Sequence, residues 1–138
     1  MQADIVSNEP RVLIVEDEAL IAEELRERLA GLGCSVIAAV DSAAEGVAIA
    51  TRERPDIVLM DIRLKGEKDG VEAAQEIRAQ VDLSIVYVSA HSDLPTVERA
   101  KSTEHDGFLL KPFHIRELRS TIEVALQRRA RRARMQKQ

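Results

Sequence analysis

Aromatic residues and cysteine are almost absent from this sequence. Phe, Tyr and Trp make up 2% of its 138 residues, so Val, Ile, Leu and Ala must build any core. The single Cys34 can form no internal disulfide, which fits a reducing compartment, and we expect it to be a small buried apolar residue.

No stretch approaches the roughly 20 apolar residues of a membrane span, and residues 1–10 lack the apolar core of a signal peptide. We therefore expect a cytoplasmic protein.

Acidic residues are missing from the end of the chain. Six basic residues and no acid follow Gln127, whereas the whole chain has 24 acidic residues and a net charge of −4. An acidic body of this kind is not expected to be a general nucleic-acid binder. We interpret the basic tail, residues 128–138, as a solvated helix extension or a frayed end. The alternative is that this tail docks on an acidic partner or on nucleic acid.

Two patterns alternate along the rest of the chain. Apolar runs typical of buried strands fall at residues 11–15, 35–40, 56–61, 83–88 and 107–110. Each run is followed by a pattern typical of an amphipathic helix, the second of which is predicted to turn inward Ala44, Val47, Ala48 and either Ala50 or Thr51. Because the connections are short, we predict one α/β domain, residues 11–127, with a parallel sheet and helical crossovers. Residues 1–10 are predicted to be a flexible N-terminal segment.

The strand at residues 56–61 ends on a carboxylate, Asp61. In an open parallel sheet, ligands bind beyond the C-terminal ends of the strands, so Asp61 is a candidate functional residue. An aspartate at a strand-to-helix junction can also simply cap the next helix. The ends of the other strands decide between these two interpretations.

The other predicted strands bring polar groups to the same edge of the sheet. Glu16 and Asp17 follow the first strand, while Ser89 and Lys111 come at the ends of the fourth and fifth. Three converging carboxylates repel one another unless a cation lies among them, and oxygen ligands select a hard ion such as Mg²⁺. The hydroxyl and the ammonium group can bind a dianionic group built on Asp61. The set predicts a Mg²⁺-assisted phosphoryl acceptor with a carboxylate nucleophile.

With these residues and Lys111-Pro112, residues 12–127 resemble the receiver domain of two-component response regulators, in particular single-domain regulators of the chemotaxis type. The resemblance implies a flavodoxin-like (βα)5 fold, a doubly wound sheet of five parallel strands in the order 2-1-3-4-5. It implies that Asp61 accepts a phosphoryl group from a phosphohistidine on a sensor histidine kinase or a histidine phosphotransfer protein. It also implies a signalling switch that acts through protein contacts and not as an enzyme on other molecules.

The resemblance assigns a role to each of the other site residues. It implies that Asp17 is a direct Mg²⁺ ligand, that Glu16 is a second acid acting through water, and that the backbone carbonyl of Arg63 is a further ligand. Ser89 and Lys111 are implied to sense the oxygens of the phosphoryl group.

The resemblance extends to the residues around the site, with departures from the family pattern. Phe108 stands at the position of the switch aromatic residue, without the hydroxyl that a tyrosine would supply there. Lys111-Pro112 is implied to be a cis peptide. Arg63 and His91 stand where the family tunes dephosphorylation, and we expect them to slow or gate water attack on the phosphoryl-aspartate. The loop 62–70 lacks the common Met-Pro pair and is one residue longer than usual.

Leu20 and Glu24 fall beside the core stripe of the first predicted helix, next to the acidic pair. We expect them to form part of a kinase-docking face. The helix of Pro95, the strand of Phe108 and the last helix are expected to form the phosphorylation-dependent surface, which binds an unidentified downstream protein or a second copy of the chain. Too few residues follow Lys111 for a DNA-binding module, so we expect the output to be protein contact.

Three alternatives stay open from the sequence. The domain could act as a phosphoryl shuttle or phosphate sink within a larger kinase assembly. A phosphatase of the haloacid dehalogenase type also uses a strand-end aspartate and Mg²⁺, but it needs a second aspartate where this chain has Arg63. A flavodoxin-like nucleotide binder would need a phosphate-binding loop after the first strand, where the acids Glu16, Asp17 and Glu18 would repel a phosphate.

Overall fold

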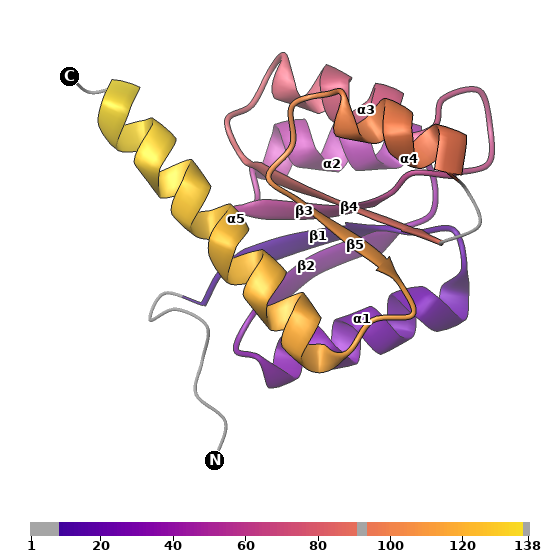
Figure 1. Ribbon diagram of the computed structural model, residues 1–138, viewed down its shortest axis with the longest axis horizontal. Helices are drawn as coiled ribbons and strands as arrows, with labels where there is room; N and C mark the ends of the chain where they lie inside the picture. The colour runs from indigo at the N-terminus through magenta and orange to yellow at the C-terminus, as the bar shows by residue number, and fades with distance from the viewer. Residues whose placement is uncertain (1–8, 91–93, 137–138) are drawn as a thin grey trace.

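A computed structural model of the chain describes residues 9–90 and 94–136 (Figure 1). Strands and helices alternate through these residues. The strands are β1 (Arg11–Val15), β2 (Ser35–Val40), β3 (Ile57–Asp61), β4 (Ser84–Ala90) and β5 (Gly107–Lys111). The helices are α1 (Ala19–Gly31), α2 (Ala43–Glu53), α3 (Gly70–Arg78), α4 (Leu94–Lys101) and α5 (Ile115–Gln136). None of the described helices has the length and apolar composition to cross a membrane.

The five strands form one parallel sheet in the order β2-β1-β3-β4-β5, which confirms the predicted topology. Because all strands run in the same direction, their carboxyl ends lie at one edge of the sheet. The register brings these ends side by side: Val15 pairs with Met60, Asp61 with Val88, and Ala90 with Lys111. The residues predicted at the strand ends therefore lie along this edge: Glu16, Asp17, Asp61, Ser89 and Lys111.

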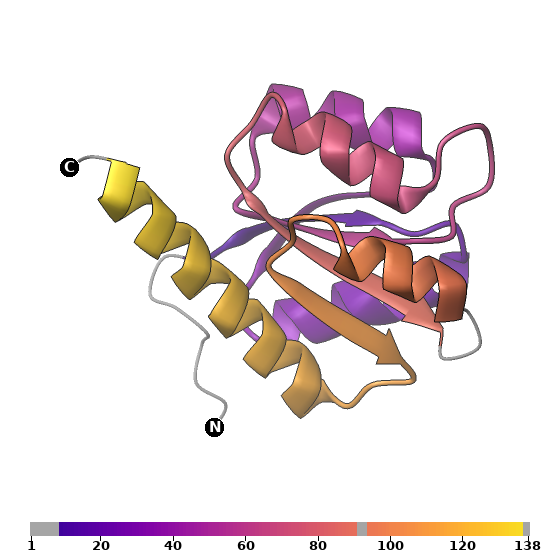
Figure 2. The ribbon, with the colours of Figure 1, turned by 45° about the horizontal axis from the view of Figure 1, so that its top comes forward.

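Successive side chains of each strand point to opposite faces of the sheet and build two cores. Leu13 and Val15 belong to the core under α2, α3 and α4, whereas Val12 and Ile14 belong to the core under α1 and α5. The two views of the ribbon show these helix layers on either side of the sheet (Figure 1, Figure 2). The aliphatic cores agree with the low aromatic content of the sequence.

The predicted inner face of α2 is wrong at two positions. Ala44 and Ala48 are exposed, and the fully buried positions of the helix are Ala43, Gly46 and Ala50. Gly46 explains this orientation, because a Cβ placed there would lie 2.9 Å from the Val15 side chain. The helix therefore rests on β1 through a residue without a side chain.

Helix α5 continues well beyond the residues that cover the sheet. It has 22 residues, which corresponds to a length of about 33 Å. Its C-terminal part extends past the body of the domain (Figure 1, Figure 2). The predicted tail thus begins within a continuous helix, and the secondary structure marks no boundary at Gln127.

Candidate functional site

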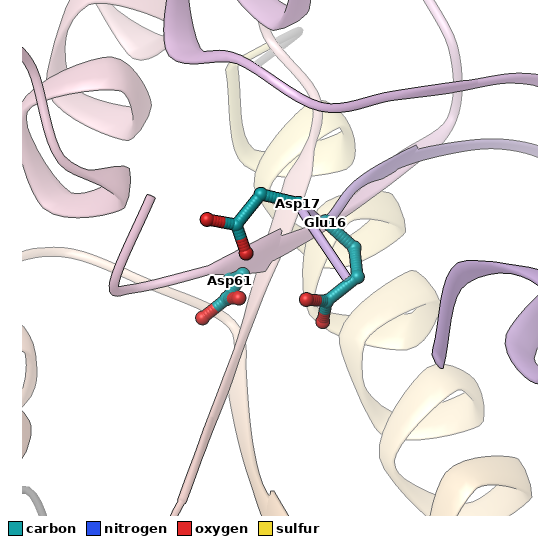
Figure 3. A group of neighbouring side chains, drawn as sticks. All are labelled: Glu16, Asp17 and Asp61. Carbon is teal, nitrogen blue, oxygen red and sulfur yellow. The ribbon is translucent and has the colours of Figure 1, made fainter. Parts of the chain in front are cut away.

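Three carboxylates meet at the carboxyl edge of the sheet (Figure 3). Glu16 and Asp17 directly follow β1, and Asp61 is the last residue of the neighbouring β3. Each residue offers one carboxylate oxygen, and these oxygens all lie within 4.8 Å of one another. The convergence predicted from the strand ends is therefore present.

Glu16 is a buried carboxylate with a donor at each oxygen. Its Oε1 accepts a hydrogen bond from Lys111 Nζ at 3.0 Å, and its Oε2 accepts one from the backbone N–H of Glu18 at 3.1 Å. Lys111 Nζ also lies 3.7 Å from Asp61 Oδ2. The lysine thus stands between two carboxylates and supplies the positive charge nearest to them.

Backbone amides of the loop after β3 hold the two aspartates. The Arg63 N–H donates to Asp61 Oδ1 at 3.1 Å, and the Lys65 N–H donates to Asp17 Oδ2 at 3.2 Å. The longer loop is therefore compatible with an ordered site, because its amides contact both acids. The predicted role of the Arg63 carbonyl as a metal ligand stays a prediction.

The closeness of the acidic groups changes the pKa values of Asp61 and Lys111. Burial raises the pKa of Asp61 from 3.8 to about 8, with further contributions from the hydrogen bond and the negative charge of Glu16. The Lys111 charge and the Arg63 amide act in the opposite direction but do not outweigh these effects. Burial lowers the pKa of Lys111, and the hydrogen bond to Glu16 together with the charges of Asp61 and Glu16 more than compensates, so its pKa is raised. Burial and the neighbouring Glu16 therefore favour the protonated form of Asp61 over the charged carboxylate.

A divalent cation fits this donor set. Glu16, Asp17 and Asp61 offer only oxygen ligands, which hard ions such as Mg²⁺ prefer. The ion would take the place of the proton on Asp61 and relieve the repulsion among the carboxylates.

Ser89 and Lys111 come from the two strands that follow β3 in the sheet. Ser89 is buried and stands one residue beyond Val88, which pairs with Asp61. Among the described residues, its Oγ has one weak contact, to the Ala90 carbonyl at 3.5 Å. The peptide bond between Lys111 and Pro112 is cis, as the resemblance implied. The hydroxyl and the ammonium group are thus on the same side of Asp61 in the sheet order.

Phe108 belongs to a small aromatic cluster. It pairs with Tyr87 across β4 and β5, and the two ring centroids are 6.4 Å apart. The His105 ring lies 6.4 Å from Phe108 and 5.6 Å from Tyr87, and Lys101 Nζ lies 5.9 Å from the Phe108 centroid. Tyr87 is fully buried, and its hydroxyl forms a hydrogen bond with Thr103 Oγ1. Since the sequence has one tyrosine and no tryptophan, its intrinsic fluorescence reports on the surroundings of Phe108.

The predicted docking residues lie on the exposed side of α1. Leu20 is 87% exposed, the largest exposure among the large apolar side chains described. Glu24 is exposed and forms an ion pair of 2.7 Å with Arg28. A largely apolar groove of about 390 Å³ lies beside them and is lined by Ile21, Glu24, Leu25, Arg28, Lys111, Pro112 and Phe113. The groove joins α1 to the β5–α5 loop and reaches the site lysine.

Of the two residues predicted to tune dephosphorylation, Arg63 belongs to the described part of the chain and His91 does not. Arg63 is exposed at the mouth of the site, in a cavity that it shares with Asp17 and Lys65. His91 lies outside the described residues. Their effect on dephosphorylation stays a prediction.

The interpretation of the basic tail as solvated is wrong for two of its arginines. Arg129 forms an ion pair of 2.9 Å with Asp56, which directly precedes β3. Arg132 contacts the buried Asp106 and donates to the Leu83 carbonyl at 3.3 Å. These arginines fasten the helix extension to the edge of the sheet opposite the acidic site. Other basic residues of the extension, Arg131 and Arg134, are exposed.

Asp106 is a structural residue that sequence reasoning missed. It directly precedes β5, its side chain is 1% exposed, and it contacts Arg78 of α3 as well as Arg132. Its Oδ2 also accepts the Ile85 N–H at 2.9 Å. The position of this acid directly before the apolar run Gly107-Phe108-Leu109-Leu110 was the signal in the sequence that pointed to it. Its partners Arg78 and Arg132 are far away in the sequence, so the contacts could not be predicted.

The chain is similar in sequence to a known family and to known proteins. The family described as response regulator receiver domain matches residues 12–123. The chain is 39% identical over 118 residues to the transcriptional regulatory protein PdtaR of Mycobacterium tuberculosis, and the match covers 86% of this chain and 57% of that protein. It is 35% identical over 117 residues to the KDP operon transcriptional regulatory protein KdpE of Escherichia coli, covering 85% and 51%. The chain thus spans about half the length of these curated relatives.

Solved structures of receiver domains are similar over most of the chain. The signal receiver domain of a modulated diguanylate cyclase from Desulfovibrio desulfuricans has a TM-score of 0.83 at 40% identity, covering 89% of this chain and 98% of that one. The receiver domain of the sensor histidine kinase PA1611 from Pseudomonas aeruginosa has a TM-score of 0.79 at 30% identity, covering 86% and 98%. That structure contains a magnesium ion coordinated in the active site cleft.

Proposed function

This chain belongs to the response regulator receiver domain family, and from that premise we propose that Asp61 takes a phosphoryl group from a phosphohistidine of a sensor kinase or phosphotransfer protein. The observation that carries the proposal is the convergence of Glu16, Asp17 and Asp61 within 4.8 Å, with Lys111 beside them. The proposed output is a change in protein contacts on the face of α4, β5 and α5. A phosphorylation-dependent homodimer is one form that this output can take.

The proposed reaction is a phosphoryl transfer between two side chains. A carboxylate oxygen of Asp61 forms a bond to phosphorus while the bond from phosphorus to the donor imidazole nitrogen breaks, and the product is an acyl phosphate on Asp61. Bound Mg²⁺ supplies charge neutralisation for the phosphoryl oxygens. Lys111 is placed to pair with a phosphoryl oxygen, since its ammonium group lies 3.7 Å from Asp61.

The remaining site residues are proposed to convert this charge into a change of shape. Ser89 gives up its weak contact with the Ala90 carbonyl and donates to a phosphoryl oxygen. The displaced hydroxyl leaves room for the Phe108 ring to pack further inward beside Tyr87. The phosphoryl group thereby favours one of two packings of the face formed by α4, β5 and α5.

Acetyl phosphate tests the acceptor without a cognate kinase. Wild-type protein incubated with acetyl phosphate and Mg²⁺ is expected to form an acid-stable, base-labile phosphoprotein, whereas Asp61→Asn forms none. Omission of Mg²⁺ is expected to prevent the reaction. Equal labelling of the wild type and the variant would refute the assignment of Asp61.

The groove beside Leu20 is proposed to receive the donor protein. Leu20→Asp places a charge on a large apolar side chain that is 87% exposed, so we expect the rate of transfer from a phosphorylated donor to fall at least about tenfold. The reaction with acetyl phosphate is expected to stay unchanged, because that small donor needs no docking. Val124→Asp, which changes another exposed apolar residue on α5, is the matched control. Normal transfer to Leu20→Asp would exclude this docking face.

A further inference from the structure

Asp69 joins the loop after β3 to two helices at once. Its Oδ1 caps α3 by accepting a hydrogen bond from the Glu72 N–H at 3.0 Å, and the Asp69 N–H donates to Glu72 Oε1 at 3.1 Å. Its Oδ2 accepts a hydrogen bond from Arg99 Nη2 of α4 at 2.6 Å. One carboxylate thus serves both as a helix cap and as an ion-pair partner of the neighbouring helix.

The end of this loop is packed directly against the phosphoryl-acceptor residue. The Gly70 N–H donates to the Ile62 carbonyl at 2.8 Å. A Cβ at Gly70 would lie 2.0 Å from the Asp61 carbonyl oxygen, so only glycine fits there. A displacement of Asp69 therefore acts on the backbone of Asp61 without any flexible side chain in between.

Arg99, the partner of Asp69, belongs to α4, which forms part of the proposed output face. Helix α4 has eight residues and is anchored by the buried Val97 and Ala100. Ala100 shares the core of Tyr87, against which Phe108 packs, and Lys101 Nζ lies near the Phe108 ring. Because α4 is short, a single ion pair can influence its position.

We propose that Arg99 and Asp69 are positioning residues for the phosphoryl-acceptor site, forming a second connection between Asp61 and α4 beside the one through Ser89 and Phe108. The inference rests on the proposed function. The pair holds the loop over Asp61 and limits access of water to the acyl phosphate. Because coupling between two sites is reciprocal, a partner that moves α4 also changes the lifetime of the phosphorylated state.

The lifetime of the acyl phosphate measures this coupling. After removal of acetyl phosphate by gel filtration, Arg99→Ala and Asp69→Ser are each expected to shorten the half-life about twofold to fivefold, as an exposed ion pair allows. Serine retains the capping of α3. The double variant is expected to lose no more than either single variant, and Arg99→Lys is expected to recover most of the wild-type half-life.

Lys68→Ala is the matched control for these variants. Lys68 is the neighbour of Asp69 and forms an ion pair of 2.8 Å with Glu76, which lies on α3 and not on α4. Its removal is expected to leave the half-life unchanged. An equal effect of Lys68→Ala and Arg99→Ala, or additive effects of Arg99→Ala and Asp69→Ser, would overturn the proposal.

Hydrogen exchange tests the coupling between the Arg99–Asp69 pair and the loop after β3 without phosphorylation. The amides of Arg63, Lys65 and Gly70 are hydrogen-bonded to Asp61, Asp17 and Ile62. Arg99→Ala is expected to accelerate exchange at these three amides, whereas Lys68→Ala is not. If wild type takes up no phosphoryl group, the proposed function fails while exchange still decides the coupling. If phosphorylation succeeds and Arg99→Ala changes neither half-life nor exchange, only the coupling is refuted.

Discussion

Asp61→Asn is expected to stabilise the metal-free protein at about pH 8, raising its free energy of unfolding above that of the wild type by roughly 2–4 kcal/mol. Burial and the neighbouring Glu16 raise the pKa of Asp61 to about 8, which means that the fold disfavours the charged carboxylate. Asparagine has a similar shape and carries no charge. The variant therefore keeps the hydrogen-bonding group and removes the repulsion.

The pH dependence follows from the sign of the pKa shift. A carboxyl whose pKa is raised in the folded state stabilises the fold fully below its ordinary pKa of 3.8, and this contribution is lost as the pH rises through about 8. The difference between Asp61→Asn and wild type should therefore grow between about pH 4 and about pH 8. Denaturant unfolding followed by circular dichroism in the presence of a chelator measures it.

Two comparisons make this result specific. Asp41→Asn, at an exposed aspartate after β2, is expected to show no such growth. Added Mg²⁺ is expected to raise the free energy of unfolding of the wild type at about pH 8 more than that of Asp61→Asn, because a ligand of the folded state stabilises it by mass action. A difference between wild type and Asp61→Asn that stays constant with pH would show that Asp61 is not held protonated by the site.

Asp106→Ala is expected to lower the free energy of unfolding by about 3 kcal/mol or more. The Asp106 side chain is 1% exposed and contacts Arg78 and Arg132, whose side chains are 15% and 25% exposed. Its loss removes the buried carboxylate that both guanidinium groups contact and leaves the Ile85 N–H without its acceptor, while Arg132 keeps its hydrogen bond to the Leu83 carbonyl. The substitution also loosens α5, which is attached to the sheet through Arg132.

Substitution of Arg132, a partner of Asp106, is expected to lower the free energy of unfolding by less than substitution of Asp106 itself. Arg132→Ala is expected to cost roughly 1–2 kcal/mol, because Arg78 still pairs with Asp106. Arg131→Ala is the matched control, since Arg131 is exposed on the same helical turn, and it is expected to change stability by less than about 0.5 kcal/mol. Denaturant unfolding of the three variants checks these values. Equal stability of Arg131→Ala and Arg132→Ala would show that the extension is not fastened by Asp106.

The sheet and its acidic edge could be predicted because they depend on local patterns. Apolar runs of strand length, each followed by a helical pattern, leave only crossover connections, and these bring Asp61 and Glu16 to one edge. The candidate site is then defined by the residues at the strand ends, without any knowledge of the distances. Arg63, two residues after Asp61, also argued against a phosphatase of the haloacid dehalogenase type, in agreement with the family match.

Side-chain partners that are far apart in sequence could not be predicted in this way. Arg132 lies 26 residues from Asp106, and Arg99 lies 30 residues from Asp69, so no periodicity links either pair. The inner face of α2 was missed for another reason. Its small apolar residues fit more than one face, and the close contact of Gly46 with β1 selects one of them.

The most direct test of the central claim is chemical mapping of the phosphorylated residue. An acyl phosphate on aspartate is reduced by borohydride, so the phosphorylated side chain becomes that of homoserine and can be located by peptide mass spectrometry. After treatment with acetyl phosphate and Mg²⁺, we predict this conversion at Asp61 and at no other aspartate, and none without Mg²⁺. Conversion at Asp17 or another acid, or no conversion in a protein that is otherwise folded, would contradict the assignment of Asp61 as the phosphoryl acceptor.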